Sequence, residues 1–168
     1  AISIPWWLDS ARLESVSGGV FLVASGDAES GDVAAWGSRV RFPFDLRVDP
    51  GGKAVVRLPG GNRMSIEEPA SLRVDASQQV SQTAGAVHYR IDRWRKENPF
   101  TVRIPQGTVV DLGTEFTVDV DSKKGSVIRV QTGRVRVMPR VGGGSVGAVA
   151  GDRVLLNERQ AVVESAVP

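Results

Sequence analysis

Apolar residues in this chain recur at every second position, in short runs that turn sequences separate. The alternation is plainest at residues 100–104, 115–121 and 134–138. Short clusters that contain glycine lie between such runs, at residues 49–52, 59–62, 122–125 and 132–133. Because successive side chains of a strand point to opposite faces, a period of two is typical of half-buried strands. The sequence therefore predicts an all-β fold, a two-layer antiparallel sandwich or β-roll of many short strands.

The start of the chain departs from this pattern. Residues 3–15 space their apolar side chains at intervals of three and four, and we expect one short helix there. This helix would belong to an N-terminal extension over residues 1–17, followed by a single domain over residues 18–168. Two neighbouring aromatic residues, Trp6 and Trp7, would either pack on the domain edge or lie in an interfacial belt beside a membrane segment outside this sequence.

Three runs in the second half are joined by links too short for a parallel crossover. We expect them to form an antiparallel meander, over residues 115–121, 126–131 and 134–138. Acidic side chains of the first strand would then face Arg129 on the second, and Arg134 and Arg136 would continue the charged row on the third. The glycine-rich residues 141–150 that follow are expected to form a mobile loop.

Composition narrows the chemistry that is open to this chain. There is no cysteine and only one histidine, His88, so thiol catalysis, disulfides and sites that need two imidazoles are excluded. The 21 basic and 19 acidic residues nearly balance, so non-specific nucleic-acid binding is not implied. We find no nucleophile–base or metal-ligand pattern and expect neither an enzyme nor a bound cofactor or metal. His88 itself is expected to be a structural histidine.

One segment combines aromatic and basic residues in a way that suits recognition. Tyr89, Arg93, Trp94 and Arg95 lie within eight positions, and such residues stack on bases or sugars and contact anionic groups. The same letters also describe a solvated connection between two strands. If the segment binds, we expect an acidic protein surface or an anionic polymer of the cell envelope, not nucleic acid.

Two further sets of charged side chains, one basic and one acidic, are candidate binding sites. The basic row of Arg129, Arg134 and Arg136 is a second candidate contact surface. An acidic set could suggest cation binding, through Asp111, Glu115, Asp119 and Asp121. Because three of these carboxylates project in line along one strand face and do not converge from a turn, a solvated face is the favoured interpretation.

Three motifs occupy the centre of the chain: Asn-Pro-Phe-Thr-Val-Arg-Ile-Pro at residues 98–105, Asp-Leu-Gly-Thr-Glu-Phe at 111–116 and Thr-Gly-Arg-Val-Arg-Val at 132–137. Together they resemble the core of the FecR domain family. In the second motif we assign folding roles to Leu112, Gly113, Thr114, Glu115 and Phe116. Gly113 would permit a bulge or close backbone approach, Thr114 would bond to the exposed backbone, and Phe116 would return to the buried face.

The resemblance implies a non-enzymatic protein-interaction or sensory module outside the cytoplasm. In that family some members relay a signal from an outer-membrane transporter to a sigma factor, and others belong to larger membrane-anchored proteins. The expected partner is another envelope protein or the rest of the full-length chain. The expected location is periplasmic or otherwise extracytoplasmic, with membrane anchoring only through a segment absent from this sequence. The alternative is a cell-envelope module that binds glycans or acts as a scaffold.

Overall fold

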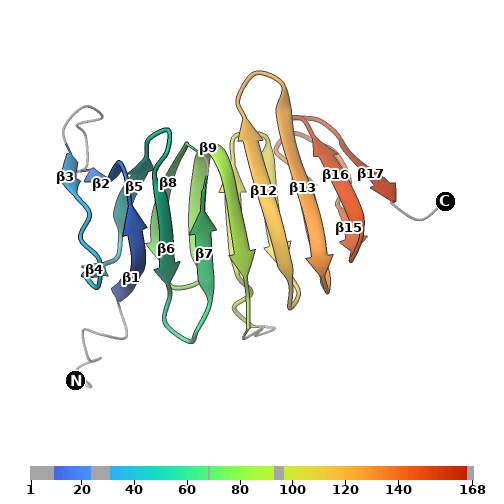
Figure 1. Cartoon of the computed structure of the whole chain (residues 1–168). Coiled ribbons are helices and arrows are strands. Elements are labelled where there is room, and N and C mark those ends of the chain that lie inside the picture. The colour runs from blue at the N-terminus through green and yellow to red at the C-terminus, as the bar shows by residue number, and fades with distance from the viewer. Residues whose placement is uncertain (1–9, 24–30, 68, 93–96, 166–168) are drawn as a thin grey trace.

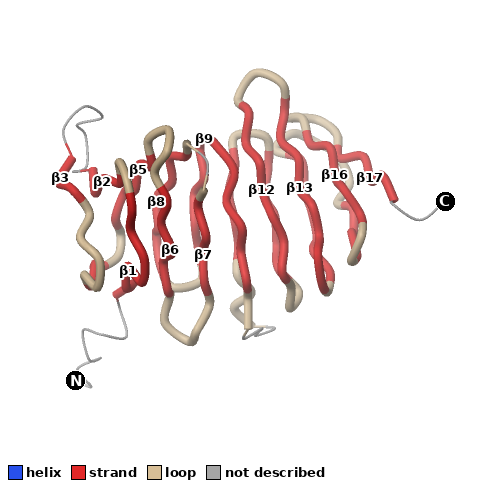
Figure 2. Tube along the Cα trace, in the orientation of Figure 1, coloured by secondary structure: helices blue, strands red, loops and turns tan. Residues whose placement is uncertain are grey.

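The computed structural model describes residues 10–23, 31–67, 69–92 and 97–165. Within these ranges the regular structure is entirely β-strand, as Figure 2 shows, so the all-β prediction is confirmed. The strands in chain order are β1 Ser10–Ser17, β2 Val20–Val23, β3 Gly31–Val33, β4 Arg39–Arg41, β5 Phe44–Val48, β6 Lys53–Arg57, β7 Arg63–Ile66, β8 Ala70–Ala76, β9 Gln79–Arg90, β10 Thr101–Ile104, β11 Gly107–Asp111, β12 Glu115–Asp121, β13 Gly125–Thr132, β14 Arg134–Pro139, β15 Val146–Val149, β16 Asp152–Leu156 and β17 Ala161–Ser165.

The strands pair in two long runs that share β9. The first sheet has the order β4-β1-β6-β7-β9-β12-β13-β16-β17, and the second has the order β3-β2-β5-β8-β9-β10-β11-β14-β15. Of the pairings between described strands, β9 with β10 is parallel and the others are antiparallel. Figure 1 shows the first sheet as a row of upright strands from β1 to β17. The finer description as a sandwich or a roll stays a prediction.

Strand β9 passes from one sheet to the other in mid-course. Its first half pairs with β8 and β10, and its second half, from Gly85 onward, pairs with β12 and β7. Gly85 has φ of +83°, and a side chain there would collide with the carbonyl oxygen of Pro69. The buried Gln82 amide stabilises the point where β9 passes between the sheets. It donates hydrogen bonds to the carbonyl oxygens of Gly85 (2.7 Å) and Val118 (2.8 Å). Its own oxygen accepts from the Tyr89 hydroxyl at 2.8 Å.

After β9 the chain adds hairpins to the two sheets in turn. The hairpins β10–β11 and β14–β15 extend the second sheet, and β12–β13 and β16–β17 extend the first. The three crossings between these hairpins each contain a glycine with positive φ, at Gly113 (91°), Gly133 (71°) and Gly151 (92°). Glycine adopts this backbone region without steric cost, so the Leu-Gly-Thr sequence at residues 112–114 forms one of the crossings.

Three local predictions are corrected by these pairings. The meander is right for β12 and β13 but wrong for β14, because the Thr132-Gly133 link crosses to the second sheet, where β14 pairs with β11 and β15. The helix prediction is wrong for residues 10–15, because these residues lie in strand β1. The prediction of a mobile loop over residues 141–150 is wrong for the last part of that range, because Val146–Val149 form β15 and Ala148 is buried.

The inward side chains of both sheets form one apolar cluster. Tyr89 lies at its centre, with ring centroids 5.2 Å from Phe116 and 5.7 Å from Phe100. Strand β1 contributes Ala11 and Leu13, both buried, so residues 10–17 pack as part of this β unit. The division of the chain into an extension over residues 1–17 and a domain over 18–168 stays a prediction.

Candidate functional site

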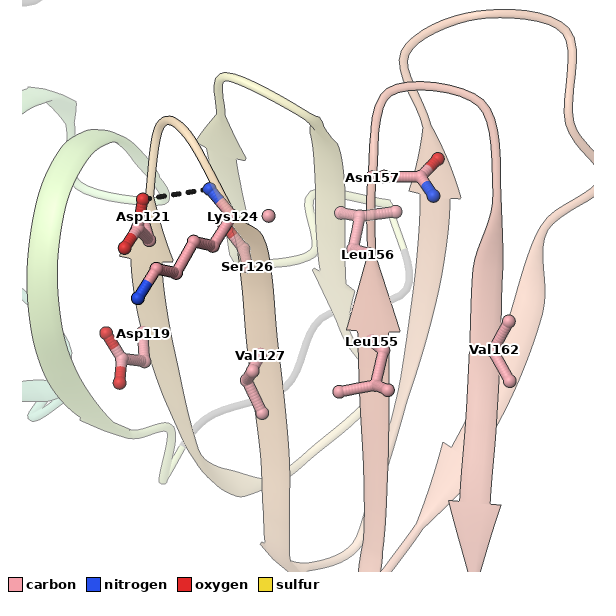
Figure 3. Close-up of a pocket in the computed structure, with 10 residues that line it drawn as sticks. Asp119, Asp121, Lys124, Ser126, Val127, Leu155, Leu156, Asn157 and Val162 are labelled. Carbon is pink, nitrogen blue, oxygen red and sulfur yellow. Dashed lines mark hydrogen bonds between the residues drawn. The ribbon is translucent and has the colours of Figure 1, made fainter.

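An exposed apolar row crosses the outer face of the first sheet at its C-terminal end. Val127 on β13 lies directly opposite Leu155 on β16, which in turn lies opposite Val162 on β17. Leu155 is 37% exposed and Val162 is 42% exposed, although both lie in regular strands. Figure 3 shows the three side chains in line on neighbouring strands. Adjacent apolar side chains left in water are typical of a contact surface.

The row is one wall of a shallow pocket whose other wall is polar. Asp119 lies opposite Val127, and Asp121, Lys124 and Asn157 complete the rim where the β12–β13 and β16–β17 turns meet. The Asp121 carboxylate accepts hydrogen bonds from the backbone nitrogens of Lys123 (2.8 Å) and Lys124 (3.0 Å, dashed in Figure 3). These bonds lower the pKa of Asp121, so the rim carries negative charge at neutral pH.

Basic side chains border the row along its other side. Arg129 on β13 and Arg153 on β16 are directly opposed, and Arg153 forms an ion pair with Glu164 on β17. The pocket and its border therefore offer apolar, acidic and basic groups within four adjacent strands, β12, β13, β16 and β17. Such a surface suits the non-covalent binding of another protein, whose interfaces combine an apolar centre with a polar rim.

The aromatic-basic candidate is corrected where the structure describes it. Tyr89 is fully buried, and burial raises the pKa of its hydroxyl. It therefore cannot stack on a ligand at the surface. Arg93, Trp94 and Arg95 lie outside the described residues, as do Trp6 and Trp7.

The basic row predicted from Arg129, Arg134 and Arg136 does not exist as one surface. Arg129 is exposed on the first sheet, whereas Arg134 and Arg136 are exposed on β14 of the second sheet. The error follows from the missed crossing at residues 132–133. Of these three arginines, only Arg129 lies beside the apolar row.

The acidic set divides in a similar way. Asp119 and Asp121 are exposed, but Asp111 is buried, and this burial raises its pKa to about 7. Asp111 accepts a hydrogen bond from the backbone nitrogen of Gly113 at 3.0 Å. No cluster of three His, Cys, Asp or Glu side chains suited to a metal ion occurs among the described residues.

The structure agrees with the expected role of Phe116 but not with that of Thr114. Thr114 is buried, and its hydroxyl has no hydrogen-bond partner within the described structure, so the expected bond to the backbone is wrong. Phe116 is fully buried on β12.

His88 links β9 to β12, because its Nε2 lies 2.8 Å from Glu115 Oε1 and its Nδ1 lies 3.0 Å from Thr117 Oγ1.

The residues of the apolar row were not singled out from the sequence. A signal was present, because Leu155 stands between Val154 and Leu156, and Val162 precedes Val163. Apolar residues at consecutive strand positions place one of them on each face. The pattern could have indicated a two-sided apolar strand, but the sequence does not say which face is covered.

The fold and this row define the class: an all-β domain with an exposed apolar row and a single apolar cluster. Comparison with protein families matches the description "FecR protein" over residues 44–136, more than half of the chain. The chain therefore belongs to the FecR family, and the predicted resemblance is confirmed. No curated protein matches the sequence.

Two crystal structures of a candidate anti-sigma factor from Parabacteroides distasonis ATCC 8503 share the fold. Each is 19% identical in sequence, with a TM-score of 0.63. The matches cover 72% and 74% of this chain but 59% and 60% of the compared chains. This chain thus spans less than two thirds of the length of those proteins, and the likeness establishes the architecture.

Proposed function

We propose that this chain is the protein-interaction and sensory module of a FecR-family signalling regulator. The observation that carries the proposal is the row of Val127, Leu155 and Val162, three apolar side chains in direct register on an open sheet face. Burying such a row against a partner gains about 25 cal/mol for each Å² of apolar surface removed from water. The acidic and basic rims would fix the orientation of that partner.

The kind of signalling is inferred from the relatives. FecR-family membership and a fold shared with a candidate anti-sigma factor support a role in sigma-factor regulation. We propose that the partner is another envelope protein or the rest of the full-length chain, and that the module works by binding, without catalysis. The glycan-binding alternative loses one of its platforms, because Tyr89 is buried.

The location belongs to the same proposal. FecR-family membership supports a periplasmic or otherwise extracytoplasmic domain, anchored by a segment outside this sequence. Within the described ranges there is no helix with the length and hydrophobicity that a membrane crossing requires.

Site-specific photo-crosslinking in cells that make the full-length protein tests the proposed contact. A photoreactive residue at Val162 is compared with one at Val149, an exposed valine (55%) on the second sheet. We expect a discrete crosslinked protein from position 162 and none from position 149. Val162→Asp should alter transcription from promoters of one alternative sigma factor, and Val149→Asp should not. Identical crosslinks from the two positions, or none from position 162, would refute the contact surface.

A further inference from the structure

Five arginines stand in one register across the opposite end of the first sheet. The paired positions run across β4, β1, β6, β7 and β9 as Arg39, Arg12, Arg57, Arg63 and Arg90. At the usual spacing of about 4.8 Å between strands, the row is roughly 19 Å long. Four of these side chains are exposed, and Arg63 is half-buried. The arginine row runs from β4 and β1, at one end of Figure 1, to β9 near its middle, and it shares no strand with the apolar row.

Described carboxylates pair with three members of this arginine row. Glu14 lies between two of its members, 3.2 Å from Arg57 and 3.1 Å from Arg63, and Asp92 lies 3.2 Å from Arg90. Arg12 has no carboxylate within 4.0 Å among the described residues. Like charges directly opposite each other destabilise a sheet, so an added anion at Arg12 would reduce its repulsion with the neighbouring arginines.

Two depressions meet at Arg12. The first is lined by Arg12, Arg39 and Arg57 together with the turn at residues 58–61, so three guanidinium groups border one hollow. Arginine presents a planar fork of N–H donors that matches a carboxylate in a bidentate pair. This hollow has the chemistry to take a carboxylate.

The second depression is lined by residues 12–15 of β1, which include Arg12 and Glu14, by Trp36 and Gly37, and by Val55. Trp36 is 72% exposed, yet its position is fixed, because its indole nitrogen donates to the backbone oxygen of Glu14 at 2.7 Å. An indole held at one edge offers its face to an apolar group. Tryptophan and arginine are the residue types most enriched at the energetic centres of protein interfaces.

We propose that the arginine row and Trp36 bind an acidic peptide segment of a partner protein. Its carboxylates lie among Arg12, Arg39 and Arg57, and a neighbouring apolar side chain rests on Trp36. The adjacent aromatic hollow favours a peptide over a bare oxyanion, which would use the arginines alone. This surface is separate from the apolar row and does not depend on the function proposed above.

Binding of a labelled peptide tests the inference. The probe is a short Glu-Glu-Leu repeat, measured by fluorescence anisotropy against the whole 168-residue chain. The comparison peptides are a Gln-Gln-Leu repeat and a Glu-Glu-Ser repeat. We expect the acidic, leucine-containing peptide to bind most tightly and its affinity to fall with added salt.

Two double variants that each remove two positive charges show where the peptide binds. Arg12→Gln with Arg39→Gln should weaken binding by about tenfold or more, as loss of charge-assisted bonds implies. Arg134→Gln with Arg136→Gln removes the same charge from the second sheet and should change affinity by less than about twofold. Trp36→Ala should weaken the leucine-containing peptide and leave the serine-containing one nearly unchanged. Circular dichroism and urea unfolding check that every variant is folded.

Other outcomes overturn the proposal. Equal weakening by both arginine pairs would reduce the effect to net charge. Tighter binding of inorganic phosphate, or of vesicles containing phosphatidylglycerol, with the same dependence on Arg12 would assign the row to a simple anion or a membrane surface. Absence of peptide binding at low salt would remove the inference altogether.

Discussion

The backbone carbonyl of Gly113 packs against the α-carbon of Gly133, leaving no space for a side chain at position 133. The two glycines belong to successive crossings between the sheets, one before β12 and one after β13. The third crossing continues the stack, because the Ala150 nitrogen donates to the Gly133 oxygen at 3.1 Å. The crossings thus pack on one another as the strands do.

Gly133→Ala is expected to destabilise the domain by about 2–4 kcal/mol, from left-handed strain and the clash with the Gly113 carbonyl together. Urea unfolding followed by circular dichroism measures the loss. Gly144→Ala is the matched control, because a Cβ at Gly144 meets nothing within 4 Å. Equal effects from the two substitutions would contradict the stacked arrangement of the crossings.

Asp111 should make the protein less stable as pH rises from about 4 to about 7. Burial raises its pKa from 3.8 to about 7 in the folded state, so in this range the folded chain binds a proton that the unfolded chain has released. The full shift corresponds to stability on the order of 4 kcal/mol. Asp111→Asn should flatten the pH dependence of the unfolding free energy and raise stability at pH 8. An unchanged pH profile in the variant would show that another group titrates.

Because Gln82 and Tyr89 share a hydrogen bond, substitutions at the two positions should have non-additive effects on the free energy of unfolding. Gln82→Leu removes three hydrogen bonds, two of them buried, at the point where β9 changes sheets and should cost about 3 kcal/mol. Tyr89→Phe should cost about 1–2 kcal/mol alone, because it leaves the Gln82 oxygen buried without that donor. In the Gln82→Leu background the same change should cost much less. A double-mutant cycle measures this coupling, and strict additivity would argue against the bond.

Asp121→Ala should weaken the β12–β13 turn in a pH-dependent manner. The carboxylate accepts two backbone hydrogen bonds, and these lower its folded pKa below 3.8. Its contribution to stability is therefore present above pH 3.8 and lost as pH falls through the folded pKa. Thermal unfolding should give a lower Tm for the variant at neutral pH and equal Tm values in strong acid. A constant difference at all pH values would point to a cause other than ionisation.

The strands could be predicted from the sequence, but not the sheet to which each belongs. The alternation at residues 115–121 describes β12 correctly, because one face of that strand is buried. A two-residue link such as Thr132-Gly133 fits a hairpin turn and a crossing equally well, since both accept a glycine with positive φ. Long-range pairing decides between them, and this is why Arg134 and Arg136 were placed on the wrong sheet.

The errors in the site and at the N-terminus also have particular causes. Tyr89 was grouped with the charged residues that follow it, although it shares its strand face with Val87, which is buried. In β1, Ala11 and Leu13 point inward with the period of a strand, and the part of the expected helix over residues 3–9 lies outside the described residues. The apolar row became visible only when β13 was brought into register with the β16–β17 hairpin.

The alternating addition of hairpins has a mechanical consequence. The strands lie across the long direction of Figure 1, with β1 near one end and β17 at the other. Hydrogen bonds between antiparallel strands are perpendicular to those strands, so they lie along a line drawn between the two ends. A pull along that line would load the strand pairs one after another, as in a zipper. Hairpins such as β16–β17 would then peel away singly under low force, while the remainder of the domain kept its shape.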